Sequence, residues 1–231
     1  MSNAELQASA ARQLLASSLH GVLSTHSQEH PGYPFGSVAP YILGHDGLPL
    51  FLLSHLSQHT HNVDGDPRCG LLVSEPGDGD VQQLGRLSAV GELGPTEPGI
   101  DGDRYFRYYP RTRTYHEQLG FRFYRFRPLH FHWNGGFATA RWFGNDRILR
   151  ANPFASGDEA ALITRLTDDA LPGLMVRPEI AAMRAGADAI AIAGIDPEGI
   201  DLRCGDAHVR IPLRAVADSV EALRKMLVDG W

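Results

Sequence analysis

The feature that most constrains the fold is a series of short apolar segments, separated by turn signals, between residues 21 and 131. Turn sequences such as His45-Asp46-Gly47 and Asp64-Gly65-Asp66-Pro67 lie between them. The expected strands are Gly21–Thr25, Gly36–Leu43, Leu48–Ser54, Cys69–Ser74, Arg86–Leu93 and Phe121–Phe131. About six short strands at this spacing are typical of an antiparallel β-barrel or sandwich.

Three segments of helical character flank or interrupt these strands. Ala4–Leu19 is amphipathic, with an expected apolar face of Leu6, Ala10, Leu14 and Leu15. Ser57–Val63 is short and polar and directly follows a strand, and Asp101–Leu119 carries tyrosines among arginines. We therefore expect helices on the outside of the barrel.

The composition changes at residues 152–157, Asn-Pro-Phe-Ala-Ser-Gly, which predicts a linker between a domain of residues 1–150 and one of residues 151–231. The second part has expected helices at Asp158–Leu171, Pro178–Ala187 and Val216–Val228 and expected strands at Ala189–Ile195, Gly199–Arg203 and Ala207–Pro212. This pattern predicts a small α+β domain.

Composition and charge narrow the class of protein. The 231 residues include 43% hydrophobic and 21% charged residues, and the net charge of −6 disfavours a nucleic-acid partner. Cys69 and Cys204 lie far apart in no metal-type spacing, which favours a reducing compartment. The N-terminus has no signal-type apolar region, and no segment has the length and composition to span a bilayer. We therefore expect a cytoplasmic protein without a membrane partner.

Small hydroxyl and amide side chains gather between residues 34 and 62, around a strand end and a helix start. They belong to Ser37, Ser54, Ser57, His59, Thr60 and Asn62. A helix N-terminus favours an anion, so this arrangement suits a phosphate group. Ordinary helix capping by Ser57 is the alternative that the composition leaves open.

Three histidines in the same stretch, His55, His59 and His61, raise the question of a metal site. A catalytic zinc site uses further nitrogen, sulfur or carboxylate ligands, and no Asp or Glu completes such a set nearby. We therefore expect no metal here.

Arginines alternate with aromatic residues from Arg104 to Arg127. Guanidinium groups beside aromatic rings suit a planar, anionic ligand. Two alternatives remain open: stacking on single-stranded nucleic acid, or a core of aromatic side chains with the arginines on a solvated face or a dimer rim. A further segment, Trp133 to Phe143, contains paired glycines, but it matches no dinucleotide fingerprint, and no hydrolase motif is present.

Together these segments resemble the pyridoxamine 5'-phosphate oxidase-like superfamily of FMN-binding split barrels, and its haem-utilisation (HugZ/HutZ-like) branch most closely. The resemblance lies in LASSLHGVLST, PFGSVAPYILGHDGLPLFLLSHLSQHTHNVDGDPRCGLLVSE, GRLSAVGEL and YFRYYPRTRTYHEQLGFRFYRFRPLHFHWNGGFATARWF, and in GIDPEGIDLRCGDAHVRIPL of the tail. It implies an α+β fold: a six-stranded antiparallel split β-barrel with flanking helices, plus a small C-terminal α+β domain. It also implies a homodimer with cofactor sites at the interface.

The resemblance further implies which residues bind the cofactor, FMN or haem. The site would comprise Ser37, Val38, Ala39, Pro40, Tyr41, Leu53, Ser54, His59, Thr60, Asn62, Arg86, Trp133, Arg141 and Trp142. Of these, His59 and Thr60 would lie at the phosphate, and Trp133, Arg141 and Trp142 would approach from the partner subunit. No residue is assigned to catalysis.

Two departures from that family pattern bear on function. Classical oxidases of the superfamily place basic side chains at the phosphate, where this chain has Ser54, His59 and Thr60, which weakens the hold on a dianion. Haem-utilisation relatives lack the same basic side chains, and some bind haem in place of flavin. The tail also lacks both histidines of a His-Met-Asn-x-Asp-His stretch, since residues 165–170 read Arg-Leu-Thr-Asp-Asp-Ala. A haem ligand would then come from elsewhere, with His208, His130 and His132 as unranked candidates.

The expected function is a flavin- or haem-binding redox protein, with haem utilisation or degradation as the activity that the resemblance implies. As an enzyme it would be an FMN-dependent oxidoreductase or a haem-degrading oxygenase. The alternative is a haem carrier or sensor that has lost oxidase activity.

Overall fold

The computed structural model describes residues 2–136, 139–154, 157–169, 180, 183 and 189–228, except for the side chains of residues 157, 158, 169, 227 and 228. The chain forms two compact units. The first comprises Met1–Pro98 and Thr112–Arg150, and the second comprises Gly99–Arg111 and Ala151–Trp231. Residues 99–111, which fall inside the expected first domain, therefore pack within the second unit.

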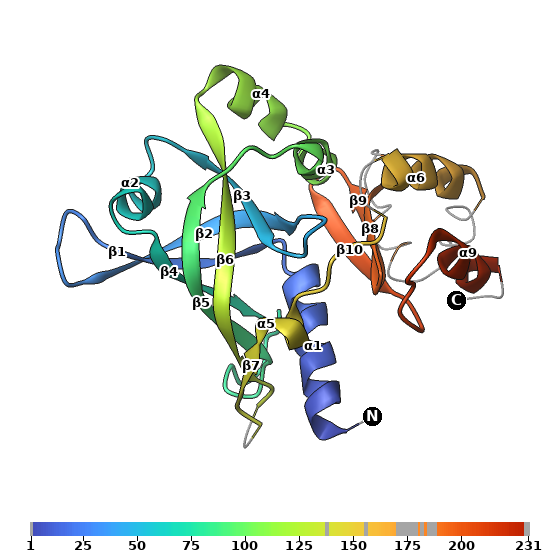
Figure 1. Cartoon of the computed structure of the whole chain (residues 1–231), viewed down its shortest axis with the longest axis horizontal. Helices are drawn as coiled ribbons and strands as arrows, with labels where there is room; N and C mark the ends of the chain where they lie inside the picture. Colours follow the sequence, from blue (N-terminus) through green and yellow to red (C-terminus); the bar gives the residue numbers. More distant parts are fainter. Residues whose placement is uncertain are drawn as a thin grey trace. The chain divides into compact units, whose positions relative to one another are not determined.

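The first unit is a closed antiparallel β-barrel with helices around it (Figure 1). Its strands are β1 (His20–His26), β2 (Pro34–Leu43), β3 (Pro49–Ser54), β4 (Arg68–Ser74), β5 (Arg86–Pro95), β6 (Phe121–Asn134) and β7 (Arg141–Gly144). They follow the order β3-β2-β1-β4-β5-β6-β7, and an additional β3–β6 pairing closes six strands into the barrel. The predicted six-stranded split barrel is confirmed, with β7 as a short addition beside β6.

Alternation of side chains along the strands builds the barrel core. In β1 the buried residues alternate with half-buried or exposed ones, and β4 repeats the pattern with Cys69, Leu71 and Val73 inside. Tyr41, Phe51 and Phe126 add fully buried aromatic rings. Burying each such side chain stabilises the fold by about 1.5–3 kcal/mol. A register shift between Val90 and Gly91 interrupts the pairing of β5 with β6.

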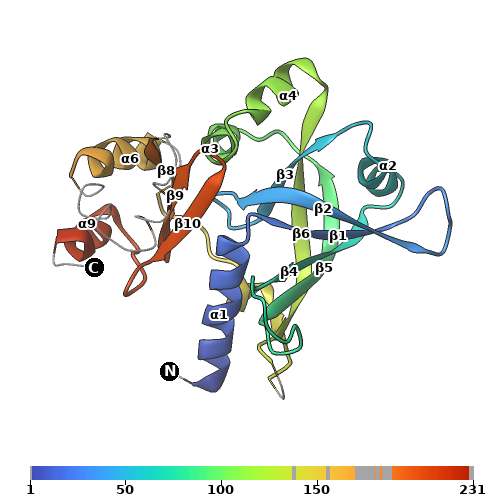
Figure 2. The same cartoon turned by 180° about the vertical axis from the view of Figure 1, so that it is seen from behind.

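The first helix, α1 (Asn3–Ser17), lies alongside the barrel (Figure 2). Its capping box joins Ser2 and Glu5 at the N-terminus. The buried face consists of Ala8, Ala11, Leu14 and Leu15, so the expected places of Leu6 and Ala10 on this face are wrong. The helix turns by 3.6 residues, and a strict spacing of four drifts off the buried stripe.

The predicted helix Asp101–Leu119 is two helices, α3 (Ile100–Tyr108) and α4 (Thr112–Gln118). Pro110 lies in the break, where it has no N–H to continue the helical ladder. The two parts differ in surroundings. α3 buries Arg104, Tyr105 and Tyr108 within the second unit, whereas no residue of α4 is buried.

The second unit contains a three-stranded antiparallel sheet of order β10-β9-β8, as predicted for the small α+β domain. Its elements are β8 (Ile190–Asp196), β9 (Gly199–Cys204), β10 (Ala207–Pro212), α6 (Gly157–Asp169) and α9 (Val220–Val228), together with α3. Both α3 and α6 pack on β8. The expected helix Pro178–Ala187 lies almost wholly outside the described residues. In the described part of the chain, no helix combines the length and apolar character needed to cross a membrane.

Candidate functional site

The polar end of the barrel is organised by α2 (Gln58–Gly65), which begins four residues after the end of β3. Ser57 occupies the N-cap position, but its side chain makes no capping hydrogen bond. The first helical hydrogen bonds run from Thr60 N and His61 N to the Ser57 carbonyl, so the N–H groups of Gln58 and His59 precede them. Capping does not account for these donors, and they are available to an anion.

His59 points from the first turn of α2 toward β2. Its Nδ1 lies 3.1 Å from Ser37 Oγ, in hydrogen-bond contact. Its Nε2 is buried and has no hydrogen-bond partner among the residues that the structure describes. Burial lowers the pKa of His59 below the ordinary histidine value of 6.5, so the ring is neutral at pH 7.

Thr60, the next residue, is 1% exposed. Its Oγ1 also has no hydrogen-bond partner within the described chain. A buried hydroxyl without a partner costs about 1–3 kcal/mol, so a native fold rarely keeps one. Two consecutive residues with unpartnered buried polar atoms, at an uncapped helix start, indicate a place for a polar ligand.

Asn62, which was expected near the phosphate, makes hydrogen bonds within the protein. Its Oδ1 accepts hydrogen bonds from Gln28 N and Gln58 Nε2, both at 3.0 Å, and its Nδ2 donates to Thr25 Oγ1 at 2.9 Å. The side chain is fully buried and links α2 to β1 and the loop after it. Asn62 therefore positions the helix.

The predicted β2 and β3 residues divide between the two faces of the barrel wall. Ser37, Ala39 and Tyr41 alternate with outward-facing Val38 and Pro40. Tyr41 donates to the Leu15 carbonyl of α1 at 2.7 Å and, like Ala39, belongs to the core. Only Ser37 of this strand offers a polar side chain to His59.

Two further predicted residues lie at the end of β3. Leu53 is a core residue. The Ser54 hydroxyl accepts from Leu56 N at 3.2 Å, which shapes the turn toward α2. Both residues support the start of the helix from the strand side.

Arg86 opens β5, where it holds the preceding loop. Its Nη1 lies 3.3–3.4 Å from the carbonyl oxygens of Val81, Gln82 and Leu84. Ser37 and Arg86 lie on β2 and β5, separated in the sheet by β1 and β4, which corresponds to roughly 14 Å across the strands. Within one subunit they do not hold the same end of a cofactor.

The three residues expected from a partner subunit differ in exposure. Trp133 is 4% exposed and lies in the barrel core. Arg141 and Trp142 are exposed on β7, and the Trp142 ring lies 4.8 Å from that of His132. Trp142 and His132 are also register partners.

Trp142 belongs to an outward-facing row that the sequence did not reveal. Consecutive register partners from β2 to β7 are Val38, Val22, Leu72, Ser88, His132 and Trp142, and the adjacent row is Gly36, Ser24, Gly70, Val90, His130 and Gly144. We call these two sets the outer-face rows. They contain no Asp, Glu, Lys or Arg, and Val38 and Trp142 are 68% and 60% exposed. The rows follow the outside of the barrel and mix valine, leucine and tryptophan with serine, histidine and glycine, without an Asp, Glu, Lys or Arg.

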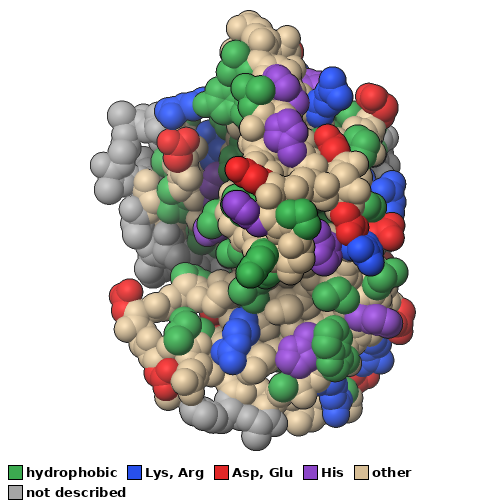
Figure 3. Space-filling view, turned by 90° about the vertical axis from the view of Figure 1, so that its left-hand side faces the viewer, with side chains coloured by type: hydrophobic (Ala, Val, Ile, Leu, Met, Phe, Trp, Pro, Cys, Tyr) green, Lys and Arg blue, Asp and Glu red, His purple; other side chains and the backbone are tan. Residues whose placement is uncertain are grey.

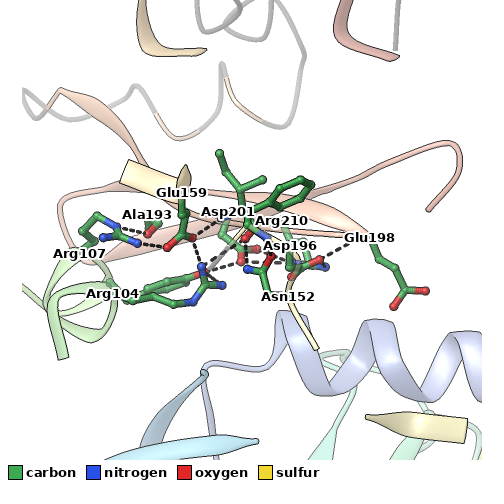
Figure 4. A network of polar contacts seen from close by, with 12 residues as sticks. Arg104, Arg107, Asn152, Glu159, Ala193, Asp196, Glu198, Asp201 and Arg210 are labelled. Carbon is green, nitrogen blue, oxygen red and sulfur yellow. Dashed lines mark hydrogen bonds and ion pairs between the residues drawn. The ribbon is translucent and has the colours of Figure 1, made fainter. Parts of the chain in front are cut away.

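The arginine and aromatic segment does not form one ligand surface. Arg104 and Arg107 of α3 both form ion pairs with Glu159 of α6, inside the second unit (Figure 4). Glu159 also accepts from Ile195 N at 3.0 Å. On β6, Arg125 Nη1 donates to both carboxylate oxygens of Asp46, each at 2.7 Å. These three arginines form ion pairs within the protein; Arg104 and Arg125 are buried, which differs from the solvated arginines of the third alternative.

The network of Figure 4 continues from α3 into the sheet. Tyr108 donates to Asp201 at 2.6 Å, and Arg210 pairs with Asp201 and Asp196 at 3.1 and 2.7 Å. Burial disfavours the charged form of Arg210, but the two aspartates outweigh this effect. The pKa of Arg210 therefore lies above its ordinary value. A Cβ at Gly194 would overlap the Tyr108 hydroxyl, so only glycine fits there. This polar network attaches α3 to the three-stranded sheet of the second unit.

The histidines do not gather into a metal centre. His55 Nδ1 is 3.1 Å from the Gly120 carbonyl, and His61 is exposed. No group of three or more metal-type ligands occurs within the described ranges. His208 Nε2 lies 3.0 Å from the Tyr108 carbonyl, and His130 and His132 lie in the outer-face rows. On the α2 side of the barrel, histidine and hydrophobic side chains reach the surface together (Figure 3).

Comparisons with known proteins agree with this fold. A solved protein of unknown function from Agrobacterium tumefaciens is 23% identical, with 96% of this chain and 94% of that chain covered and a TM-score of 0.76. A heme binding protein from Mycobacterium smegmatis is 23% identical, with coverages of 99% and 96% and a TM-score of 0.57. At these identities the likeness shows the fold.

A chloroplastic non-canonical heme oxygenase from Arabidopsis thaliana is 40% identical over 63 residues. The match spans 27% of this chain and only 20% of that relative. The model of the family described as "CREG, beta-barrel" matches residues 2–147, which is more than half of the chain. The chain belongs to the CREG β-barrel family of FMN-binding-type split barrels.

Proposed function

We propose that the protein binds a flat, anionic cofactor, FMN or haem, and functions in redox chemistry, with the anionic group of the cofactor at the N-terminus of α2. The observation that carries the proposal is the pair of buried, unpartnered polar atoms His59 Nε2 and Thr60 Oγ1. They lie next to the uncapped helix start at Ser57. A phosphate or a propionate carboxylate supplies the acceptors that these groups lack.

The residues at the start of α2 can donate hydrogen bonds to an anion, but they attract it less strongly than a Lys or Arg side chain would. The donors would be the Thr60 hydroxyl, the His59 imidazole and the N–H groups of Gln58 and His59. Ser37 would hold the His59 ring in place. No Lys or Arg lies in α2, so the site lacks a permanent positive charge from its own helix. A bound flavin would supply hydride or oxygen chemistry, and haem would supply oxygen chemistry.

A second copy of the chain is the partner that we infer for the outer-face rows. The row with three glycines and a serine lets another sheet approach closely, and Val38, Leu72 and Trp142 supply apolar contacts. Exposed apolar side chains without charged neighbours in the same rows are typical of an interaction site, and packed sheet faces lie about 10 Å apart. Such a dimer would bring Arg141 and Trp142 of one copy toward the cofactor of the other.

The relatives support the cofactor class. One structural relative is described as a heme binding protein and the plant relative as a heme oxygenase. Haem degradation is therefore the activity that we propose if the protein is an enzyme. The absence of a positive side chain in α2 favours the second candidate, a carrier that binds the cofactor without turnover.

The two cysteines support a reducing compartment such as the cytoplasm. Both are buried free thiols, and burial raises the pKa of Cys69 to about 12. Such a thiol is unreactive toward disulfide exchange.

The test begins with the visible spectrum of the protein as isolated, followed by titration with FMN, riboflavin and haem. Binding of FMN much more tightly than riboflavin, which lacks the phosphate, supports the anion site. Binding of haem that is followed by loss of its Soret band with reductant and oxygen supports degradation, and a stable band supports the carrier. If neither cofactor binds, the proposal is wrong.

A further inference from the structure

The surroundings of the His59 ring disfavour a positive charge in the ligand-free protein. Its Nδ1 contacts only the uncharged Ser37 hydroxyl, and its Nε2 is buried without a partner in the described chain. A protonated ring would therefore place a positive charge in a half-buried position with no acid beside it. Burying an unpaired charge is unfavourable, so the ring stays neutral until a negative group lies next to it.

Of the three strands packed against α2, only β5 carries an acid, and this residue, Glu92, is exposed. α2 contacts β1, β2 and β5. The ionisable residues of those strands are His20 and His26 on β1, Tyr41 on β2, and Arg86 and Glu92 on β5. Within α2 itself, His61 and Asp64 are exposed, and Asp64 accepts from Tyr124 at 3.0 Å. Burial is the one cause that shifts the pKa of His59, in agreement with this geometry.

From this geometry, and resting on the proposed anion site, we propose that the binding of a dianion at the start of α2 is coupled to the uptake of one proton from solvent by His59. The His59 Nε2–H of the resulting imidazolium donates to the anion, and Nδ1–H donates to the Ser37 hydroxyl. The positive charge that other phosphate sites obtain from Lys or Arg is thus acquired only with the ligand.

The coupling has a measurable size. An opposite charge within hydrogen-bonding distance raises a histidine pKa by about 1–3 units. Between the pKa values of the free and the occupied site, the affinity for the dianion therefore increases about tenfold for each unit by which the pH falls. Above the pKa of the occupied site, the ring is neutral with and without ligand, so its protonation no longer changes the affinity with pH.

The experiment is calorimetric titration of the full chain with sulfate and with FMN near pH 7, in buffers that differ in ionisation enthalpy. Sulfate does not titrate in this range, whereas a phosphate monoester has a second pKa near 6. Midway between the pKa values of the free and the occupied site, a rise of about 1–3 units corresponds to uptake of roughly 0.5–0.9 proton per site. We expect this uptake in the wild type and in His61→Gln, a control on the exposed side of the same helix. His59→Gln, which keeps a donor but does not titrate, should show no uptake and weaker binding.

A second readout uses the NMR titration of the His59 ring, assigned by its loss in His59→Gln. Its pKa should rise when sulfate or FMN is added. Binding of FMN without proton uptake, or with an unchanged His59 pKa, overturns this inference and leaves the proposed function intact. Failure of both FMN and haem to bind overturns the proposed function as well.

Discussion

Replacing Thr60 by valine separates a ligand-binding role from a structural one, because the change removes the hydroxyl and keeps the shape. Thr60 is buried and its Oγ1 has no partner among the described residues. Valine has a helix propensity close to that of threonine, so the backbone contributes little to the difference. Removing an unsatisfied buried hydroxyl should increase the free energy of unfolding of the ligand-free protein by about 1–3 kcal/mol.

The matched control is Thr25→Val on β1. Thr25 is also buried, but its hydroxyl donates to the Phe35 carbonyl at 3.3 Å and accepts from Asn62 Nδ2 at 2.9 Å. Its removal leaves Asn62 with an unpaired donor, so the free energy of unfolding should fall by about 1–3 kcal/mol. The two threonine-to-valine changes thus have opposite expected signs.

Urea unfolding, followed by the fluorescence of Trp133 and Trp142 in the barrel, measures both variants. The same Thr60→Val protein should bind FMN more weakly by roughly ten- to a hundred-fold, the loss of a hydrogen bond to a charged group. If Thr60→Val destabilises the protein as much as Thr25→Val does, its hydroxyl has an internal role and the reasoning for the anion site is refuted.

Three further predictions concern the C-terminal unit, the outer face and pH. Glu159→Gln should lower the free energy of unfolding of the second unit by about 3–5 kcal/mol, because Glu159 is buried between two guanidinium groups. Hydrogen exchange in β8 measures this loss, and a loss below about 1 kcal/mol contradicts the prediction. Trp142→Glu should convert a dimer to a monomer in sedimentation experiments, whereas Val81→Glu, on a loop outside the outer-face rows, should not; a persistent dimer argues against that interface. Burial lowers the pKa of His59 below its unfolded value of 6.5, so the unfolded chain binds more protons as the pH falls. The free energy of unfolding should therefore decrease as the pH falls through 6.5. An equal dependence of that free energy on pH in His59→Gln would exclude this cause.

The barrel was predictable because its signal is local. Short strands separated by turns are visible in the sequence, and β1 and β4, with seven residues each, show alternating burial clearly. The Arg104–Tyr108 segment was not predictable, because its charges are matched by Glu159 and Asp201, which lie far along the chain. Arginines beside tyrosines look the same whether their partner is a ligand or a distant carboxylate.

The candidate site shows the same limit. Ser37, His59 and Thr60 were expected together, and the structure places His59 between Ser37 and the helix start. Asn62 and Arg86 were expected at the cofactor, but their partners are backbone and side-chain groups of α2, β1 and the β4–β5 loop. The sequence does not show how many hydrogen bonds a polar side chain already makes, and that number distinguishes Asn62 from Thr60.

The central claim is that the anionic end of the cofactor lies at the start of α2. Backbone amide NMR of the isotope-labelled protein tests it most directly, during titration with FMN and, separately, with riboflavin. The account predicts that the amide signals of Gln58, His59 and Thr60 shift strongly with FMN and little with riboflavin. Equal shifts with both ligands, or shifts confined to other parts of the chain, would contradict it.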